Sequence, residues 1–214
     1  SVNLIVDVNN LDDLCPEKFA NTDIALEFTT PHSALQNILF CLENNIPLVT
    51  GTTGWKDHFP EVEKKCREKN GSLFYSSNFS PGVNVIFAVN EYLAKLMNKL
   101  PGYDIKITET HHTNKLDAPS GTAISLAEQI IQNNPSVKNW SLDENSQKDN
   151  FQIEAIREKD VIGIHEIKYE SVIDYITLKH HAKTRRGLAE GTVLAAEYLL
   201  NRKGIFTMRD MLGI

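Results

Sequence analysis

The chain has 214 residues, 41% hydrophobic and 23% charged, enough to bury the core of one large domain or two small ones. Its formal net charge is -6 and its lysines and arginines form no tract, which argues against nucleic-acid or membrane-surface partners. No apolar run approaches the ~20 residues of a membrane span, and Cys15, Cys41 and Cys66 suit neither a disulfide framework nor a zinc site. We therefore expect a cytoplasmic protein whose partner is a small molecule or another protein.

The first part of the chain alternates β-rich runs with helical patterns, which is typical of a parallel sheet with crossover helices. Strands are expected at 3–8, 23–28, 47–50 and 72–77, and helices at 33–45 and 59–70, the second with Pro60 near its start. Because the strand runs are continuously apolar, both faces of this sheet should be covered.

A second unit should begin at the Pro-Gly turn of residues 80–84, where a helix with one apolar stripe follows. Alternating apolar and polar residues then predict half-buried strands, open to solvent or a partner on one face; these are 103–110, 151–158, 163–170 and 174–181. Residues 187–204 predict a helix with a glycine at its far end, and residues 141–150 a loop.

Two adjacent histidines dominate the stretch ETHHTNKLDAPSGTA (109–123). His111 and His112 follow an alternating strand, so their side chains should point to opposite faces and have different roles. Histidine can transfer a proton near neutral pH, and Lys115 supplies a compact positive charge that can hold a carboxylate.

A helix start follows the histidines. Its first backbone N–H groups, around Ser120, Gly121 and Thr122, lack helical partners and favour an anion. The residues thus predict a pocket for a small anion beside a proton donor. On physical grounds alone, a polar loop leading to an N-capped helix is an equally good interpretation.

The same stretch resembles the signature of the 4-hydroxy-tetrahydrodipicolinate reductases, also called dihydrodipicolinate reductases, bacterial enzymes of the diaminopimelate route to lysine. Five further segments follow the family's order and spacing, so the likeness spans nearly the whole chain: EFTTP (27–31), GTTGW (51–55), SSNFSPGVN (76–84), HHAKTRRGLAEGT (180–192) and GIFTMRDML (204–212).

The resemblance implies an α/β fold in two parts. A Rossmann-like parallel-sheet dinucleotide-binding domain would comprise residues 1–80 and 186–214, and an α+β domain with an open mixed sheet would comprise residues 81–185. The second domain would bind substrate and build a homotetramer. The implied reaction is the reduction of 4-hydroxy-tetrahydrodipicolinate, a cyclic dicarboxylate, to tetrahydrodipicolinate by NADH or NADPH, with no metal.

Carried over to this sequence, the resemblance makes His111 the general acid and Lys115 the second proton donor. The substrate would contact His112, Gly121, Thr122 and Arg185. GTTG and SSNF each follow a predicted strand, at the carboxyl ends where open parallel sheets bind ligands, although GTTG alone could be an ordinary turn. The cofactor contacts implied by the family are Phe28, Thr29, Gly51, Thr52, Thr53, Ser76, Ser77, Asn78 and Phe79.

One family feature is missing from the sequence. Members begin with a strand, a G-x-G-x-x-G turn and a helix that hold the pyrophosphate, and this chain has no such turn. We expect an N-terminally truncated reductase that lacks the first βα unit and binds the cofactor weakly. Asn9 and Asn10 occupy the strand end where a charged residue would select NAD or NADP, so the preference stays open; they can equally form a turn.

Two other classes of function are weighed against the reductase. A non-catalytic ligand-binding relative, or an inactive fragment, would be compatible with the missing glycine turn. A metal-dependent hydrolase would use His111, His112, His180 and His181, but adjacent histidines on a strand chelate poorly and no H-E-x-x-H spacing is present.

Overall fold

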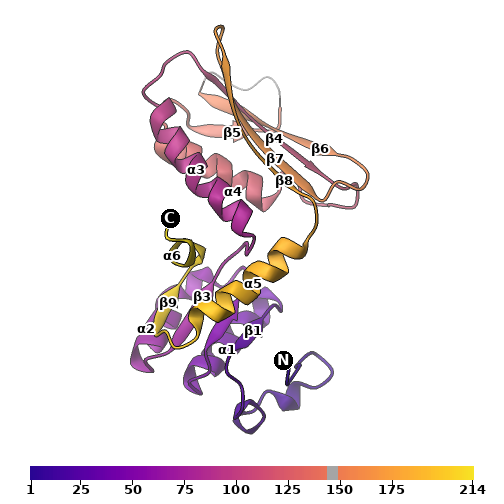
Figure 1. Cartoon of the computed structure of the whole chain (residues 1–214), viewed down its shortest axis with the longest axis vertical. Helices are drawn as coiled ribbons and strands as arrows, with labels where there is room; N and C mark the ends of the chain where they lie inside the picture. Colours follow the sequence, from indigo (N-terminus) through magenta and orange to yellow (C-terminus); the bar gives the residue numbers. More distant parts are fainter. Residues whose placement is uncertain (144–148) are drawn as a thin grey trace. The chain divides into compact units, whose positions relative to one another are not determined.

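The computed structural model describes residues 1–143 and 149–214, which form two compact units. Unit 1 comprises Ser1–Ser80 and Leu188–Ile214, and unit 2 comprises Pro81–Gly187 (Figure 1). Part of the loop predicted at 141–150 lies outside the described residues. Among the described residues, no helix has the length and apolar character needed to cross a membrane.

A parallel sheet organises unit 1. Its strands are β1 (Ala25–Glu27), β2 (Leu48–Thr50), β3 (Ser72–Tyr75) and β9 (Gly204–Phe206), in the order β1-β2-β3-β9. The helices are α1 (Pro31–Glu43), α2 (Phe59–Glu68), α5 (Arg186–Leu199, whose first two residues fall in unit 2) and α6 (Met208–Leu212). Three short 3-10 helices accompany them: η1 (Leu11–Asp13), η2 (Pro16–Phe19) and η3 (Lys56–His58).

Both faces of this sheet are covered, as the continuous apolar strands predicted. Leu48 and Leu73 pack into a cluster with α1 and α2, whereas the next residues along the same strands, Val49 and Phe74, pack into a cluster with α5 and α6. This alternation follows from the period of two along a strand, and it makes each short strand apolar throughout.

Two expectations for unit 1 are wrong. Residues 3–8 form no strand, because β1 is paired with β2 alone among the described strands and the segment has no ladder partner. Helix α5 ends at Leu199 rather than at Gly204. The chain leaves the helix through Asn201, which takes a left-handed φ of 61°, and Gly204 begins strand β9 instead of capping the helix.

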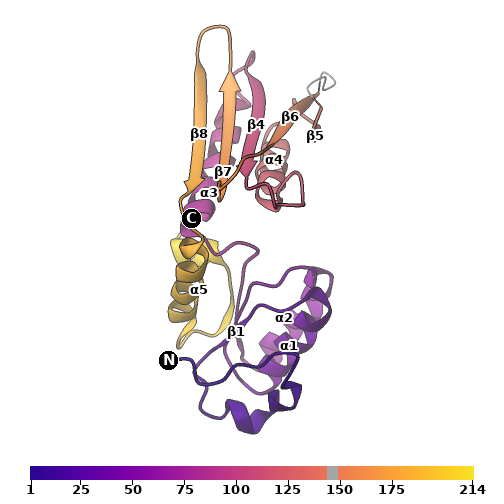
Figure 2. The same ribbon diagram turned by 90° about the vertical axis from the view of Figure 1, so that its right-hand side faces the viewer.

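Unit 2 is a mixed sheet with two helices on one face. Its elements are α3 (Pro81–Met97), β4 (Asp104–His111), α4 (Gly121–Asn133), β5 (Asn139–Ser141), β6 (Asn150–Arg157), β7 (Gly163–Glu170) and β8 (Tyr175–Ala182). The strand order is β5-β6-β4-β7-β8. Strand β4 runs parallel to β6 and antiparallel to β7, and the β7–β8 hairpin is the long antiparallel arm in Figure 2.

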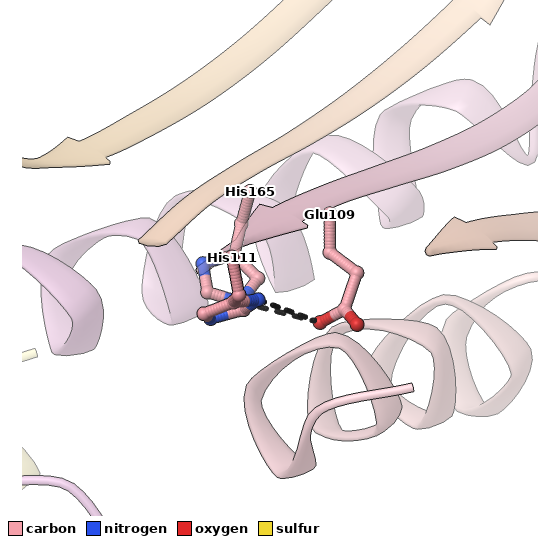
Figure 3. Close-up of side chains that lie close together, drawn as sticks. All are labelled: Glu109, His111 and His165. Carbon is pink, nitrogen blue, oxygen red and sulfur yellow. Dashed lines mark ion pairs between the residues drawn. The ribbon is translucent and has the colours of Figure 1, made fainter. Parts of the chain in front are cut away.

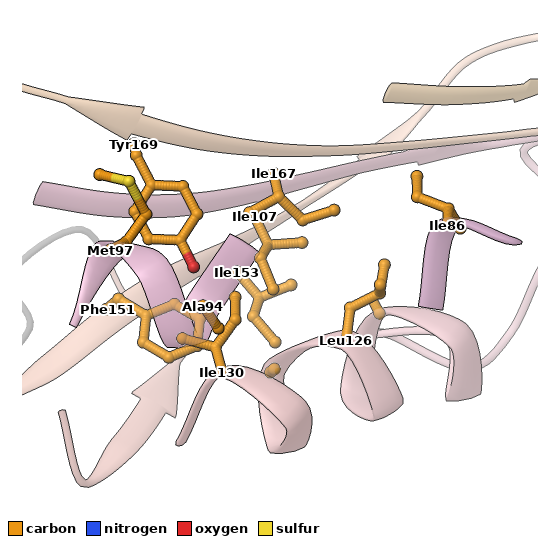
Figure 4. Close-up of a cluster of buried hydrophobic side chains, with 12 residues drawn as sticks. Ile86, Ala94, Met97, Ile107, Leu126, Ile130, Phe151, Ile153, Ile167 and Tyr169 are labelled. Carbon is orange, nitrogen blue, oxygen red and sulfur yellow. The ribbon is translucent and has the colours of Figure 1, made fainter. Parts of the chain in front are cut away.

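The core of unit 2 lies between this sheet and helices α3 and α4. Ile107, Ile153 and Ile167 come from three neighbouring strands and meet Leu126 and Ile130 of α4 (Figure 4). Each such buried side chain contributes about 1.5–3 kcal/mol relative to exposure. The opposite face of the sheet carries ion pairs between exposed or half-exposed side chains, such as Lys179 with Glu166 at 2.8 Å. This polar face agrees with the prediction of strands that are open to solvent or a partner on one side.

Candidate active site

Alternation along strand β4 sends Glu109 and His111 to the same side of the sheet, toward the start of helix α4. Glu109 is fully buried and His111 is 8% exposed. His112, the next residue, is half-buried and has a different partner, Arg185.

Four groups surround the Glu109 carboxylate. Oε2 accepts a hydrogen bond from the Ser120 backbone N–H at 3.0 Å, and Oε1 accepts one from Arg157 Nη2 at 3.2 Å. Nδ1 of His111 lies 3.4 Å from Oε2, and Nε2 of His165 lies 3.9 Å from it. In Figure 3 both imidazole rings lie beside this carboxylate. A buried charge is tolerated only with such partners.

His165 comes from β7, where it pairs in register with Glu109. Its Nε2 is 3.1 Å from Oγ of Ser120, the N-cap residue whose Oγ also accepts the Ala123 N–H. Burial, with the neighbouring His111 charge, lowers the pKa of His165 to about 4, and Glu109 opposes this shift. His165 is therefore neutral at physiological pH.

The pKa of His111 is also lowered, but here opposing charges contribute. Burial lowers its pKa most, and the cations Lys115 and Arg157 act in the same direction, whereas Glu109 and Asp117 raise it. Its ring meets that of His165 edge to face, with centroids 5.1 Å apart. The protonated form of His111 is thus favoured by nearby carboxylates and disfavoured by burial.

Arg157 also binds the loop that carries Lys115. Its Nη2 donates to the Asp117 carbonyl at 2.7 Å and its Nε to the Lys115 carbonyl at 3.4 Å. The Lys115 ammonium contacts both carboxylate oxygens of Asp117 at 2.8 Å. Glu109 and Arg157 therefore connect three predicted site elements: the end of β4, the Lys115 loop and the start of α4.

The remaining predicted substrate contacts lie beside these elements. Arg185 Nη2 is 3.0 Å from His112 Nε2. Because a guanidinium can only donate, His112 Nε2 accepts and its ring proton is on Nδ1. Gly121 and Thr122 open helix α4, and a Cβ built on Gly121 would meet nothing within 4 Å, so the space in front of this glycine is open.

The cluster of Glu109, His111 and His165 is a poor metal site because its carboxylate is already occupied. One ligand atom each from Glu109, His111 and His165 lies within 4.8 Å of the others. However, the Arg157 guanidinium and the Ser120 N–H already bind the two Glu109 oxygens. A positive guanidinium on the same carboxylate opposes a cation there, and the arrangement fits a hydrogen-bonded network.

A second set of predicted residues gathers at the carboxyl ends of β1, β2 and β3. Glu27 is a buried carboxylate that accepts from the hydroxyls of Thr29, Thr50 and Thr52. The Thr29 N–H also donates to Thr52 Oγ1 at 2.8 Å, so this network fixes the EFTTP and GTTG loops against each other.

A pocket of about 180 Å³ lies beside this network. Its lining includes four of the predicted cofactor contacts and the aromatic rings of Trp55 and Tyr75; the full set is Thr52, Thr53, Gly54, Trp55, Lys56, Tyr75, Ser76 and Ser77. The other predicted contacts lie outside this lining. Asn78 accepts the Ser76 hydroxyl at its carbonyl (2.7 Å) and the Ser80 N–H at Oδ1 (2.9 Å).

Gly51 is required for the position of Phe28. A Cβ built on Gly51 would lie 2.1 Å from Phe28 Cε1, so only glycine leaves room for this ring. Phe28 is 55% exposed, and its ring centroid is 5.7 Å from that of the buried Phe79. Asn9 and Asn10 instead form a local turn with Asp7, through hydrogen bonds of 2.7 Å.

Comparisons with known proteins agree with this geometry. A family model described as "Dihydrodipicolinate reductase, N-terminus" matches residues 3–79, and one described as "Dihydrodipicolinate reductase, C-terminus" matches residues 82–212. The chain belongs to the dihydrodipicolinate reductase family. The resemblance seen in the sequence is thereby confirmed. The C-terminal family model includes α5 and α6, which pack almost entirely within unit 1.

Curated relatives carry the same family name. The 4-hydroxy-tetrahydrodipicolinate reductase of Christiangramia forsetii is 48% identical over 191 residues, covering 89% of this chain and 80% of that protein. That of Methanocaldococcus jannaschii is 36% identical over 205 residues, covering 92% and 73%. This dihydrodipicolinate reductase family member is accordingly an oxidoreductase of diaminopimelate and lysine biosynthesis that uses NADH or NADPH.

A solved structure supports the fold. The dipicolinate-bound dihydrodipicolinate reductase from Paenisporosarcina sp. TG-14 superposes with a TM-score of 0.75 at 24% identity, covering 96% of this chain and 80% of that chain. The amine dehydrogenase from Mycobacterium smegmatis has a TM-score of 0.56 at 12% identity, covering 92% and 78%. Both show the α/β fold expected from the sequence.

Sequence reasoning missed the residues that organise the candidate site. Glu109 stands two residues before His111, and that spacing on a strand could have placed both on one face. Arg157 and His165 come from distant strands, and no local signal connects them with the histidine motif. Glu27 belongs to the EFTTP segment, but nothing in that segment indicates that its carboxylate accepts from three threonines.

Proposed function

We propose that this reductase converts 4-hydroxy-tetrahydrodipicolinate to tetrahydrodipicolinate, with His111 as the general acid and Lys115 as the second proton donor. One observation carries the proposal: Glu109 and Arg157 connect buried His111, the Lys115 loop and the open start of helix α4. A proton donor, a cation and an anion-binding helix start are the groups that reduction of a cyclic dicarboxylate requires.

The dicarboxylate would bind at the start of α4. The Ser120 N–H already donates to Glu109, which leaves the N–H groups of Gly121 and Thr122 for one substrate carboxylate. His112 and Arg185 would contact the substrate as a pair, with the guanidinium supplying positive charge. The carboxylate would also attract Lys115 away from the exposed Asp117.

The cofactor would bind to unit 1, and the nicotinamide supplies the hydride when bound. The pocket lined by Thr52, Thr53, Ser76 and Ser77 fits such a group, because it combines hydroxyl groups with aromatic walls at the carboxyl ends of parallel strands. Phe28, Thr29, Gly51, Asn78 and Phe79 would complete the cofactor contacts. Residues 1–80 and 186–214 would thus form the cofactor domain, and residues 81–185 the substrate domain.

During the reaction the substrate would gain a hydride from the nicotinamide and a proton from His111, and would lose its 4-hydroxyl group as water. His111 would afterwards regain a proton from solvent. Its burial beside Glu109 keeps the donor next to a fixed negative charge and largely away from water. Lys115 would neutralise the negative charge of the bound dicarboxylate and act as the second donor.

The partners would be small molecules and copies of the same chain, with no nucleic acid or membrane involved. The open face of the mixed sheet supports a homotetramer, since it carries paired charges and the exposed aromatic ring of Tyr175 on strand β8. The cytoplasm is the proposed compartment, where the cofactor and the biosynthetic intermediates occur.

The direct test is loss of nicotinamide absorbance when the chain is mixed with NADH or NADPH and freshly made substrate. Turnover that dipicolinate inhibits competitively with the substrate supports the proposal. Binding of either nucleotide, measured by nicotinamide fluorescence, without any turnover would support the non-catalytic relative instead.

A further inference from the structure

Glu109 is a buried carboxylate of unit 2 whose polar neighbours come from four elements, β4, β6, β7 and α4. Strand β4 contributes His111, β6 contributes Arg157, β7 contributes His165 and the start of α4 contributes Ser120. A fully buried carboxylate with a partner on each side is costly to build into a core, and simple packing would be satisfied by an apolar residue.

The position of the His111 imidazole is constrained on two sides, by Glu109 and by Gly163. On one side, Nδ1 is 3.4 Å from Glu109 Oε2, within ion-pair range although no hydrogen bond is aligned. On the other side, a Cβ on residue 163 would stand 3.1 Å from Nε2, so Gly163 leaves the space that this nitrogen occupies. The two nitrogens therefore face different surroundings, a carboxylate and a glycine.

We infer that Glu109 is the positioning residue of the reductase: it orients the His111 ring through Nδ1 and stabilises its protonated form, so that Nε2 is the donating atom. After donation, the neutral ring would keep its remaining proton on Nδ1, facing Glu109, and take up a proton from solvent at Nε2. The inference rests on the proposed role of His111 as general acid.

The charged groups around His111 shift its pKa in opposite directions, so the direction of the pKa change in a variant tests the inference. Glu109 and Asp117 favour the protonated ring, whereas Lys115 and Arg157 oppose it. His165 stays neutral near physiological pH, and His180 of β8, its register partner, is also shifted by burial toward the neutral form, with a lowered pKa. Removing Glu109 or Arg157 should therefore change the His111 titration in opposite directions.

The decisive experiment is a ¹⁵N NMR titration of the histidine rings in the full chain without substrate or cofactor. In Glu109→Gln, the pKa of His111 should fall and its neutral Nδ1–H tautomer should lose population. In Arg157→Met, the pKa should rise, because the carboxylate stays and a cation is removed. The internal control is the backbone amide spectrum, whose signals away from the site should keep their positions in all variants.

Turnover gives the second measurement. Glu109→Gln should lower kcat by roughly 10²-fold, with its decline at alkaline pH moved to lower pH and the cofactor KM little changed. Glu109→Asp keeps the charge, so its His111 pKa should remain nearer that of the parent chain. A purely structural role would reduce activity in these variants without the opposite pKa shifts.

The inference is overturned if His111 titrates identically in the parent chain and in Glu109→Gln. Should Glu109→Gln fail to fold, Arg157→Met decides by the same criterion, since a pKa that does not rise contradicts the inference. Failure of the proposed function is a separate result: a parent chain without turnover would still report the His111 pKa shifts.

Discussion

Replacing Gly51 by Ala tests whether Phe28 forms part of the cofactor site. The new Cβ would lie 2.1 Å from Phe28 Cε1, so the ring must retreat by about 1.4 Å to reach an ordinary carbon contact of about 3.5 Å. Because Phe28 is 55% exposed, it can turn toward solvent without disturbing the core. The free energy of unfolding should change by less than about 1 kcal/mol, so the Tm should shift by less than about 4 °C.

Nucleotide binding should respond more strongly than stability. A displaced ring would remove an aromatic contact of about 1.4 kcal/mol, so the Kd for NADH or NADPH should rise about tenfold. Nicotinamide fluorescence measures this directly. The matched control is the same substitution in a Phe28→Ala background, where no ring remains to be displaced and Gly51→Ala should add little. An unchanged Kd in the single variant, or an equal loss in both backgrounds, would refute the reasoning.

Three further predictions concern stability and reactivity. Ile130→Ala should cost about 2–5 kcal/mol in urea unfolding, because this fully buried side chain leaves a cavity; a loss below ~1 kcal/mol would contradict the core described. Burial raises the pKa of Cys41 to about 12 and also raises that of Cys66, so DTNB at pH near 8 should modify Cys15 first and the other two only after unfolding. Since the folded pKa of His165 is about 4 and its ordinary value is 6.5, the unfolded chain binds more protons between these values. Stability should thus fall as pH drops through this window, and His165→Gln should remove roughly 1–3 kcal/mol of that fall; an unchanged pH profile would refute the assignment.

The fold could be predicted largely because its signals are local. The apolar runs that became β2 and β3 and the amphipathic pattern of α2 each depend on neighbouring residues. Residues 3–8 have the same β-rich composition but form no strand, since a strand also needs a hydrogen-bonded neighbour. The local sequence likewise predicts Gly204 as a helix cap, whereas the pairing of β9 with β3 makes it the first residue of a strand.

The site was predictable only where its residues are close in the sequence. His111, Lys115 and Gly121 belong to one stretch, whose chemistry suggested an anion pocket with a proton donor. The partners that fix this stretch, Arg157 and His165, depend on the registers of β6 and β7 against β4. Such registers follow from the packing of the whole sheet, and local periodicity does not specify them.

The most direct test of the account compares kcat and the substrate KM of His111→Gln and His112→Gln, measured over a range of substrate concentrations with saturating cofactor. His111→Gln should lower kcat by roughly 10²–10⁴-fold while the chain stays folded, as expected for a positioned proton donor. His112→Gln, which alters the Arg185 contact, should mainly raise the substrate KM. An undiminished kcat in His111→Gln would contradict the central claim that this buried imidazole delivers the proton.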